Sequence, residues 1–149
     1  MEWNDEQGRV LHGLCLGQPL AVLATASGAT PYASLVAIAM TPDLRRLYFA
    51  TPRATRKAAN LAGNRQVALL LDNRSNRLTD FTRGAAATIV GSAEELQGTA
   101  RTSGLDFFLG RHPHLAEFTA SPGTALFMVT VARISLVTRF QQVMDYDLS

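Results

Sequence analysis

Two segments of this 149-residue chain are apolar on both alternating faces, and they restrict the possible folds more than any other feature. They are Tyr32–Met40, where Ser34 is the only polar residue, and Gln66–Leu71. Successive side chains of a β-strand point to opposite faces, so such a strand must be covered on both sides. One side can face the interior of a barrel, and the other then needs a helix or a second subunit. The alanines of Tyr32–Met40 also leave room for a flat or bulky group to approach.

The remaining pattern predicts about six strands with helices inserted between them. We expect strands at residues 20–25, 32–40, 45–50, 66–71, 85–95 and 124–140, and helices at 5–16, 58–62, 97–111 and 115–119. Because strands and helices do not alternate regularly, the order favours an antiparallel barrel with peripheral helices, in one domain spanning residues 1–149. Gly91 indicates a bulge or a close backbone approach. Arg133 indicates a bulge or a solvent-facing position in the last strand.

The segment Thr51–Lys57 joins the third strand to a helix that ends at Gly63-Asn64, and it carries the strongest candidate ligand site. Pro52 has no N–H and should end the strand, while Thr55 is a suitable N-cap. Arg56 and Lys57 then fall in the first helical turn, where free N–H groups and the helix dipole already favour an anion. Two cations are unfavourable for the helix there, which indicates a use such as binding a phosphate. The alternative is that both side chains simply point into water.

Composition excludes several other classes of protein. A net charge of +2 is too small to argue for nucleic acid or an anionic membrane as a partner, and no apolar run approaches the roughly 20 residues of a membrane span. The single cysteine, Cys15, excludes an intrachain disulfide, and with an N-terminus unlike a signal peptide it predicts a cytoplasmic protein.

Side chains that carry out chemistry by themselves are scarce. Glycine-rich nucleotide loops, a serine nucleophile elbow and clustered carboxylates are all missing from the sequence. His112 and His114 flank a proline, but no third ligand stands near them, so no metal is expected. A phosphate-like anchor with few catalytic side chains suggests a bound cofactor that carries the chemistry.

A polar loop, Asp72–Arg77, follows the fourth strand. Loops of this kind can line a ligand site or contact a second subunit, although most are only solvated. Asn73 and Ser75 are therefore candidate cofactor contacts.

Four segments at their spacings resemble the pyridoxamine 5'-phosphate oxidase-like flavoproteins, which have the FMN-binding split-barrel fold. The segments are Pro31–Val36, Leu47–Pro52, Thr55–Lys57 and Asn60–Leu61, within a resemblance that runs from Leu20 to Phe140. The resemblance implies a six-stranded antiparallel split β-barrel. It also implies FMN as the cofactor and a homodimer with FMN at the subunit interface.

The resemblance also assigns roles to residues. In that family an Arg-Lys pair and a threonine at a strand end hold the FMN phosphate, and the edge of the isoalloxazine ring lies along the second strand. The candidate cofactor contacts are Ser34, Leu35, Val36, Ala50, Thr51, Arg56 and Lys57, together with Asn73 and Ser75.

Two departures separate this chain from the true oxidases of the family. Ala85 and Ala86 stand where those enzymes have a flavin-contacting glutamine, and Asp145–Ser149 stand in place of a basic C-terminal segment. The resemblance therefore predicts the fold and the FMN site rather than the vitamer oxidase reaction.

We expect an FMN-dependent oxidoreductase of unassigned substrate. Alternatives are a deazaflavin-dependent reductase, a haem-binding relative and a non-catalytic flavin-binding module. The only histidines that could ligate haem are His12, His112 and His114.

Overall fold

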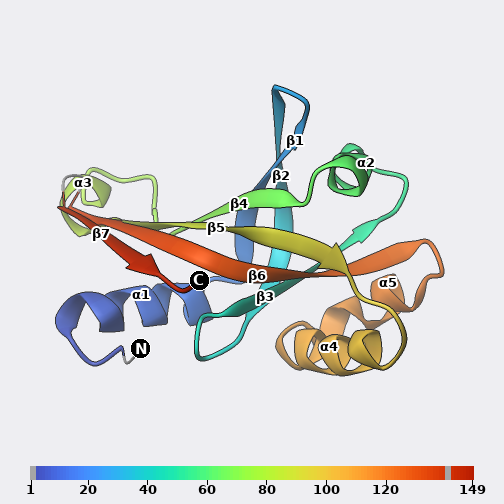
Figure 1. The fold of residues 1–149 in the computed structure, drawn as a ribbon. Helices are drawn as coiled ribbons and strands as arrows, with labels where there is room; N and C mark the ends of the chain where they lie inside the picture. Colours follow the sequence, from blue (N-terminus) through green and yellow to red (C-terminus); the bar gives the residue numbers. More distant parts are fainter. Residues whose placement is uncertain (1–2, 140–141) are drawn as a thin grey trace.

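The computed structural model describes residues 3–139 and 142–149, which form a closed six-stranded antiparallel β-barrel with a seventh strand outside it (Figure 1). The barrel strands follow the order β3-β2-β1-β4-β5-β6, and pairing of β3 with β6 closes the ring. The strands are β1 Leu20–Ser27, β2 Thr30–Met40, β3 Arg46–Pro52, β4 Gln66–Asp72, β5 Ala85–Glu95, β6 Thr124–Thr138 and β7 Gln142–Asp147. The split-barrel fold predicted from the sequence is confirmed.

Helices lie around the barrel (Figure 1). They are α1 Glu6–Gly17, α2 Arg56–Gly63, α3 Asp80–Arg83, α4 Gly98–Arg111, the 3-10 turn η1 Pro113–Leu115 and α5 Ala116–Ala120. Thr55 is the N-cap of α2, as predicted, and its hydroxyl accepts a 3.2 Å hydrogen bond from the backbone N–H of Ala58. None of the helices in the described residues is long and apolar enough to cross a membrane.

Both faces of the second half of β2 are covered by other residues, as the apolar residues on both of its faces predicted. Val36, Ile38 and Met40 point into the main core inside the barrel. On the other face, Ala39 packs with Tyr48 and Phe108 in a smaller core beneath α4. The first half of the strand departs from the prediction, because Tyr32, Ala33 and Leu35 are exposed, and 64% of the surface of Leu35 is accessible on the outer side of the barrel.

Strand β7 was not predicted from the sequence. This strand pairs with Arg133–Thr138, the second half of β6, while the first half of β6 pairs with β3. The sequence of β7, QVMDYD, is short and mostly polar, and most of its residues are exposed at the edge of the sheet, so it lacks the apolar alternation of a buried strand. The predicted last strand ended at Phe140, which lies outside the described residues.

The predicted irregularity at Gly91 is confirmed. Val90 pairs with Arg133 and Gly91 pairs with Val131, so Ala132 is an extra residue of β6, and Arg133 beside it is exposed. A Cβ atom on Gly91 would lie 2.3 Å from the backbone oxygen of Thr130. Glycine is needed because the neighbouring backbone leaves no room for a side chain.

Replacing Gly91 by alanine should therefore destabilise the barrel by about 2 kcal/mol, because the clash is with backbone that cannot move freely. The matched control is Gly13→Ala in α1, where a Cβ meets nothing within 4 Å. That variant should gain about 0.5–1 kcal/mol from helix propensity. Urea unfolding measures both changes, and equal stabilities of the two variants would contradict the close approach at Gly91.

Candidate functional site

A groove of about 230 Å³ on the outer side of the barrel gathers most of the candidate residues. Leu35 and Val36 come from β2, Ala50 and Thr51 from the end of β3, and Lys57 from the first turn of α2. The chain brings them together because β2 and β3 are antiparallel neighbours and α2 begins shortly after β3 ends. These five predicted positions share one site.

The opposite wall of the groove was not predicted. It consists of Phe108 from α4, Leu115 from η1 and Phe118 from α5. The sequence shows Phe108 only as part of an apolar helical stripe, a pattern that usually means core packing. Phe108 is indeed fully buried in the smaller core, and its additional place beside the groove depends on how α4 docks.

Lys57 is the only charged side chain among the described residues that line the groove. No carboxylate stands among these lining residues to neutralise it. The Thr51 hydroxyl lies 3.3 Å from the Thr55 hydroxyl that caps α2, so hydroxyl groups and free helix N–H groups lie close to this end of the groove. The arrangement suits an anion at the Lys57 end and an apolar group against the remaining walls.

Ser34 and Arg56 lie outside the lining of the groove. The Ser34 hydroxyl oxygen is buried and has no hydrogen-bond partner among the described residues, which is uncommon for a buried polar atom. The Arg56 guanidinium carbon lies 5.9 Å from the ring centroid of Tyr32, on the β1–β2 hairpin.

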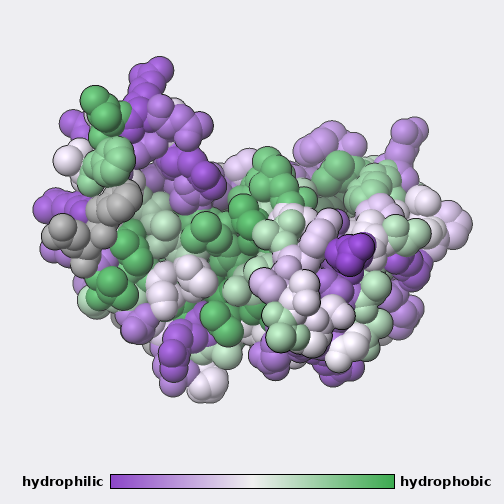
Figure 2. Space-filling model, turned by 90° about the horizontal axis from the view of Figure 1, so that it is seen from above, coloured by the Kyte–Doolittle hydropathy of each residue, from purple (hydrophilic) through white to green (hydrophobic). Residues whose placement is uncertain are grey.

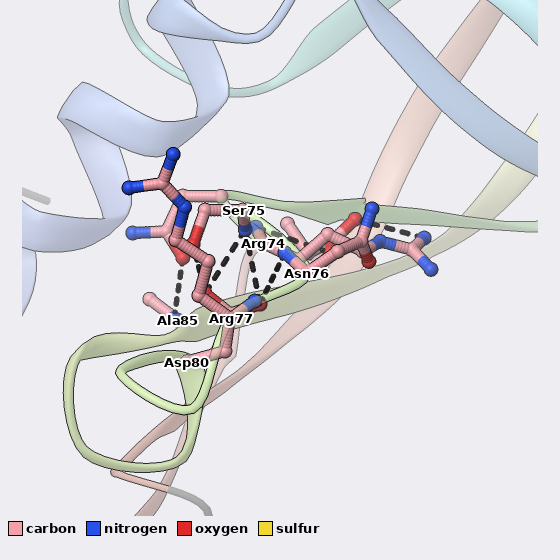
Figure 3. Close-up of polar contacts among 8 residues, drawn as sticks. Arg74, Ser75, Asn76, Arg77, Asp80 and Ala85 are labelled. Atoms are coloured by element: carbon pink, nitrogen blue, oxygen red, sulfur yellow. Dashed lines mark hydrogen bonds and ion pairs between the residues drawn. The ribbon is translucent and has the colours of Figure 1, made fainter.

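Asn73 and Ser75 belong to a different part of the molecule, the loop of residues 73–79 between β4 and α3 (Figure 3). Asn73 accepts a 2.8 Å hydrogen bond from the N–H of Ala85. The Asp80 carboxylate accepts bonds from the Ser75 hydroxyl, at 2.7 Å, and from the Ser75 and Asn76 N–H groups. Both predicted residues hold the loop in shape, and neither lines the groove of its own chain.

Hydrogen bonds from the backbone and side chain of Ser75 lower the pKa of the Asp80 carboxyl below its usual value. The hydrogen bonds to the charged Asp80 carboxylate therefore stabilise the loop fully at pH values above the ordinary carboxyl pKa. This stabilisation is lost as the pH falls through the lowered pKa of Asp80. The loop also carries Leu78, which is 86% exposed, and Arg74, which pairs with Asp72 at 2.6 Å.

An apolar ladder connects the groove with this loop across the outer side of the barrel. Leu35 lies opposite Val22, and Val22 lies opposite Leu70, which borders a second groove of about 390 Å³. Asn73 and Arg74 line that second groove. Hydrophobic residues gather over the middle of the molecule, where β1, β2 and β4 lie, with more polar surface around them (Figure 2).

None of the three histidines is among the residues that line the groove, although the His112 ring packs against that of Phe108, with centroids 5.1 Å apart. His112 is buried, and its Nε2–H donates to the carbonyl of Ile38 at 2.7 Å. His12 contacts the carbonyl of Pro42, and the ring of His114 packs edge-on against His112. No group of three or more potential metal ligands occurs among the described residues.

The comparisons with known proteins identify the family. Residues 11–138 match the family of pyridoxamine 5'-phosphate oxidase, so the chain belongs to this family. A comparison with curated protein sequences gave no match.

Solved structures share the fold at low sequence identity. A heme-binding protein from Mycobacterium smegmatis has a TM-score of 0.84 and 14% identity over 97% of this chain and 59% of its own. Campylobacter jejuni ChuZ has a TM-score of 0.78 and 13% identity over 94% of this chain and 58% of its own. A FAD-binding protein from Mesorhizobium loti has a TM-score of 0.66 and 18% identity, covering 83% and 88% of the two chains. The chain thus spans about three fifths of the length of the first two of these proteins.

The role of Asp80 can be tested by limited trypsin digestion at Arg74 and Arg77. Asp80→Asn removes the charge that orders the loop, so cleavage after these arginines should become several-fold faster. Asp106→Asn, an equal loss of charge on the exposed side of α4, should leave the rate unchanged. Equal cleavage of all three proteins would show that the Asp80 bonds do not order the loop.

Proposed function

We propose that this protein is an FMN-binding oxidoreductase of the pyridoxamine 5'-phosphate oxidase family that works as a cytoplasmic homodimer. The observation that carries the proposal is the groove in which Lys57 and Thr51 stand at one end and apolar side chains form the other walls. A phosphate joined to a flat aromatic ring system has this same division between charged and apolar parts.

The residues present fit FMN on further grounds. Lys57 is unopposed by any carboxylate among the described residues of the groove. Arg56 stands next to it in the first turn of α2.

In this proposal Arg56, Lys57 and Thr51 hold the phosphate, with the helix N–H groups supporting the negative charge. Backbone groups of Ser34, Leu35 and Val36 orient the polar edge of the ring, while Ala50 leaves room for it. Phe108, Leu115 and Phe118 exclude water from the opposite side. FMN, when bound, supplies hydride or electron transfer through its N5 atom.

A second copy of the chain would complete the site. The groove of about 230 Å³ is smaller than the roughly 300–1,000 Å³ usual for pockets that hold a cofactor or a drug-sized ligand. If a two-fold axis passes through the apolar ladder, the same surface of each subunit forms the interface. The two ladders then run in opposite directions, so the first end of one ladder lies against the second end of the other. The groove of one subunit would then face the second groove of its partner, beside Asn73 and the loop that contains Ser75.

Haem is a second candidate ligand because structural neighbours include a heme-binding protein. The histidines argue against axial ligation in the groove, since none of the three lines it. A deazaflavin remains an alternative with the same phosphate anchor, as does a flavin-binding module without catalysis.

The first experiment is an absorbance spectrum of the purified protein after FMN is added and the protein is desalted. Retained flavin bands are expected, and Arg56→Ala combined with Lys57→Ala should weaken FMN binding by about 3 kcal/mol, or about 100-fold in Kd. Arg46→Ala combined with Arg65→Ala removes the same charge from exposed positions outside the groove and should change Kd little.

Absence of flavin uptake by the unmodified protein would overturn the proposal, and a Soret band on haem titration would then favour the haem alternative. If FMN binds but no reductant and acceptor pair turns it over, the non-catalytic module is favoured.

The dimer can be tested at Leu70, at the end of the apolar ladder that borders the second groove. Leu70→Glu places a charge where the second subunit would bury it, so the dimer should dissociate into monomers in sedimentation experiments. Val143→Glu is the matched control, because Val143 is 60% exposed on β7, outside the ladder. A dimer that survives Leu70→Glu unchanged would exclude this surface as the interface.

A further inference from the structure

Helix α2 contacts the β1–β2 hairpin through two pairs of residues. Arg56 and Asn60 are four residues apart and therefore share one face of α2. Thr25 and Tyr32 are direct partners across the hairpin. Asn60 contacts Thr25 and Arg56 contacts Tyr32, so one face of the helix meets one pair of hairpin residues.

The first contact is buried and rigid. The Asn60 side-chain amide donates a 3.0 Å hydrogen bond to the Thr25 hydroxyl, and both residues are almost completely buried. A buried polar bond of this kind is costly to break, because each group would lose a partner in a place that water does not reach. It fixes the helix against the hairpin and so places Arg56 opposite Tyr32.

The second contact is at the surface and involves a charge. The guanidinium carbon of Arg56 lies 5.9 Å from the centre of the Tyr32 ring, within the range of a cation–π interaction. Arg56 forms no ion pair with a carboxylate within residues 3–139 and 142–149. The aromatic ring therefore restricts the side chain without neutralising its charge, and Arg56 directly precedes Lys57 in the first turn of α2.

We infer that Tyr32 is a positioning residue of the anion site and that it acts through Arg56. An exposed arginine loses considerable side-chain freedom when it binds a ligand, and a side chain that is already restricted loses less. Tyr32 thus sets how strongly the site distinguishes a flavin that carries a phosphate from one that does not. The inference rests on the proposed function, because it assumes that the anion is the phosphate of FMN.

The test is a double-mutant cycle on the binding of FMN by the full chain, followed by flavin fluorescence. Tyr32→Ala should weaken FMN binding about two- to fivefold, the size of an exposed cation–π contact. Tyr32→Phe keeps the ring and should bind FMN as the unmodified protein does. In an Arg56→Ala background, Tyr32→Ala should have no further effect.

Riboflavin provides the readout that separates this role from a general structural role of Tyr32. It lacks the phosphate, so the unmodified protein and Tyr32→Ala should bind it with the same affinity. Equal loss of FMN and riboflavin binding, or a loss that persists in the Arg56→Ala background, would overturn the inference. An unchanged FMN affinity of Tyr32→Ala would overturn it as well, while leaving the proposed function intact. If the unmodified protein binds no FMN, the proposed function fails and the inference fails with it.

Discussion

Pairing between β3 and β6 is the interaction on which the rest of the structure depends. Seven consecutive residue pairs, from Arg46 with Thr130 to Pro52 with Thr124, close the sheet into a barrel. Closure removes two strand edges and gives the interior a continuous apolar lining. It also holds Thr51 opposite Ala125 at the point where the chain leaves the sheet for α2. The position of Lys57 beside the groove thus follows from the closure of the barrel.

Much of this arrangement could be predicted because it depends on local sequence signals. The apolar faces of β2 required two covered sides, Pro52 and Thr55 marked the passage from strand to helix, and Gly91 marked the bulge. The family motif placed Leu35, Thr51 and Lys57 together. Each of these signals lies within a few residues of the structure that it predicts.

Other features depend on contacts between distant segments and leave no local signal. The groove wall formed by Leu115 and Phe118 depends on how the helical segment between β5 and β6 packs against β2 and β3. His112 illustrates the same limit: Ile38 donates its N–H to the carbonyl of Pro19, which has no N–H to return the bond. His112, 74 positions further along the chain, donates to the Ile38 carbonyl instead. The sequence around Ile38 gives no sign of its contact with His112, and the sequence around His112 gives no sign of Ile38.

The location of the groove on the outer side of the barrel has a consequence for how such proteins diversify. Adjacent residues of a strand point to opposite sides, so Leu35 and Ala37 face outward while Val36 and Ile38 belong to the interior core. Outward residues can be exchanged one by one without repacking the interior. Chains with little sequence in common can therefore retain the same barrel, as the shared fold of proteins named for heme and for FAD illustrates. Along β2, residues that face the groove therefore alternate with residues that fill the interior of the barrel.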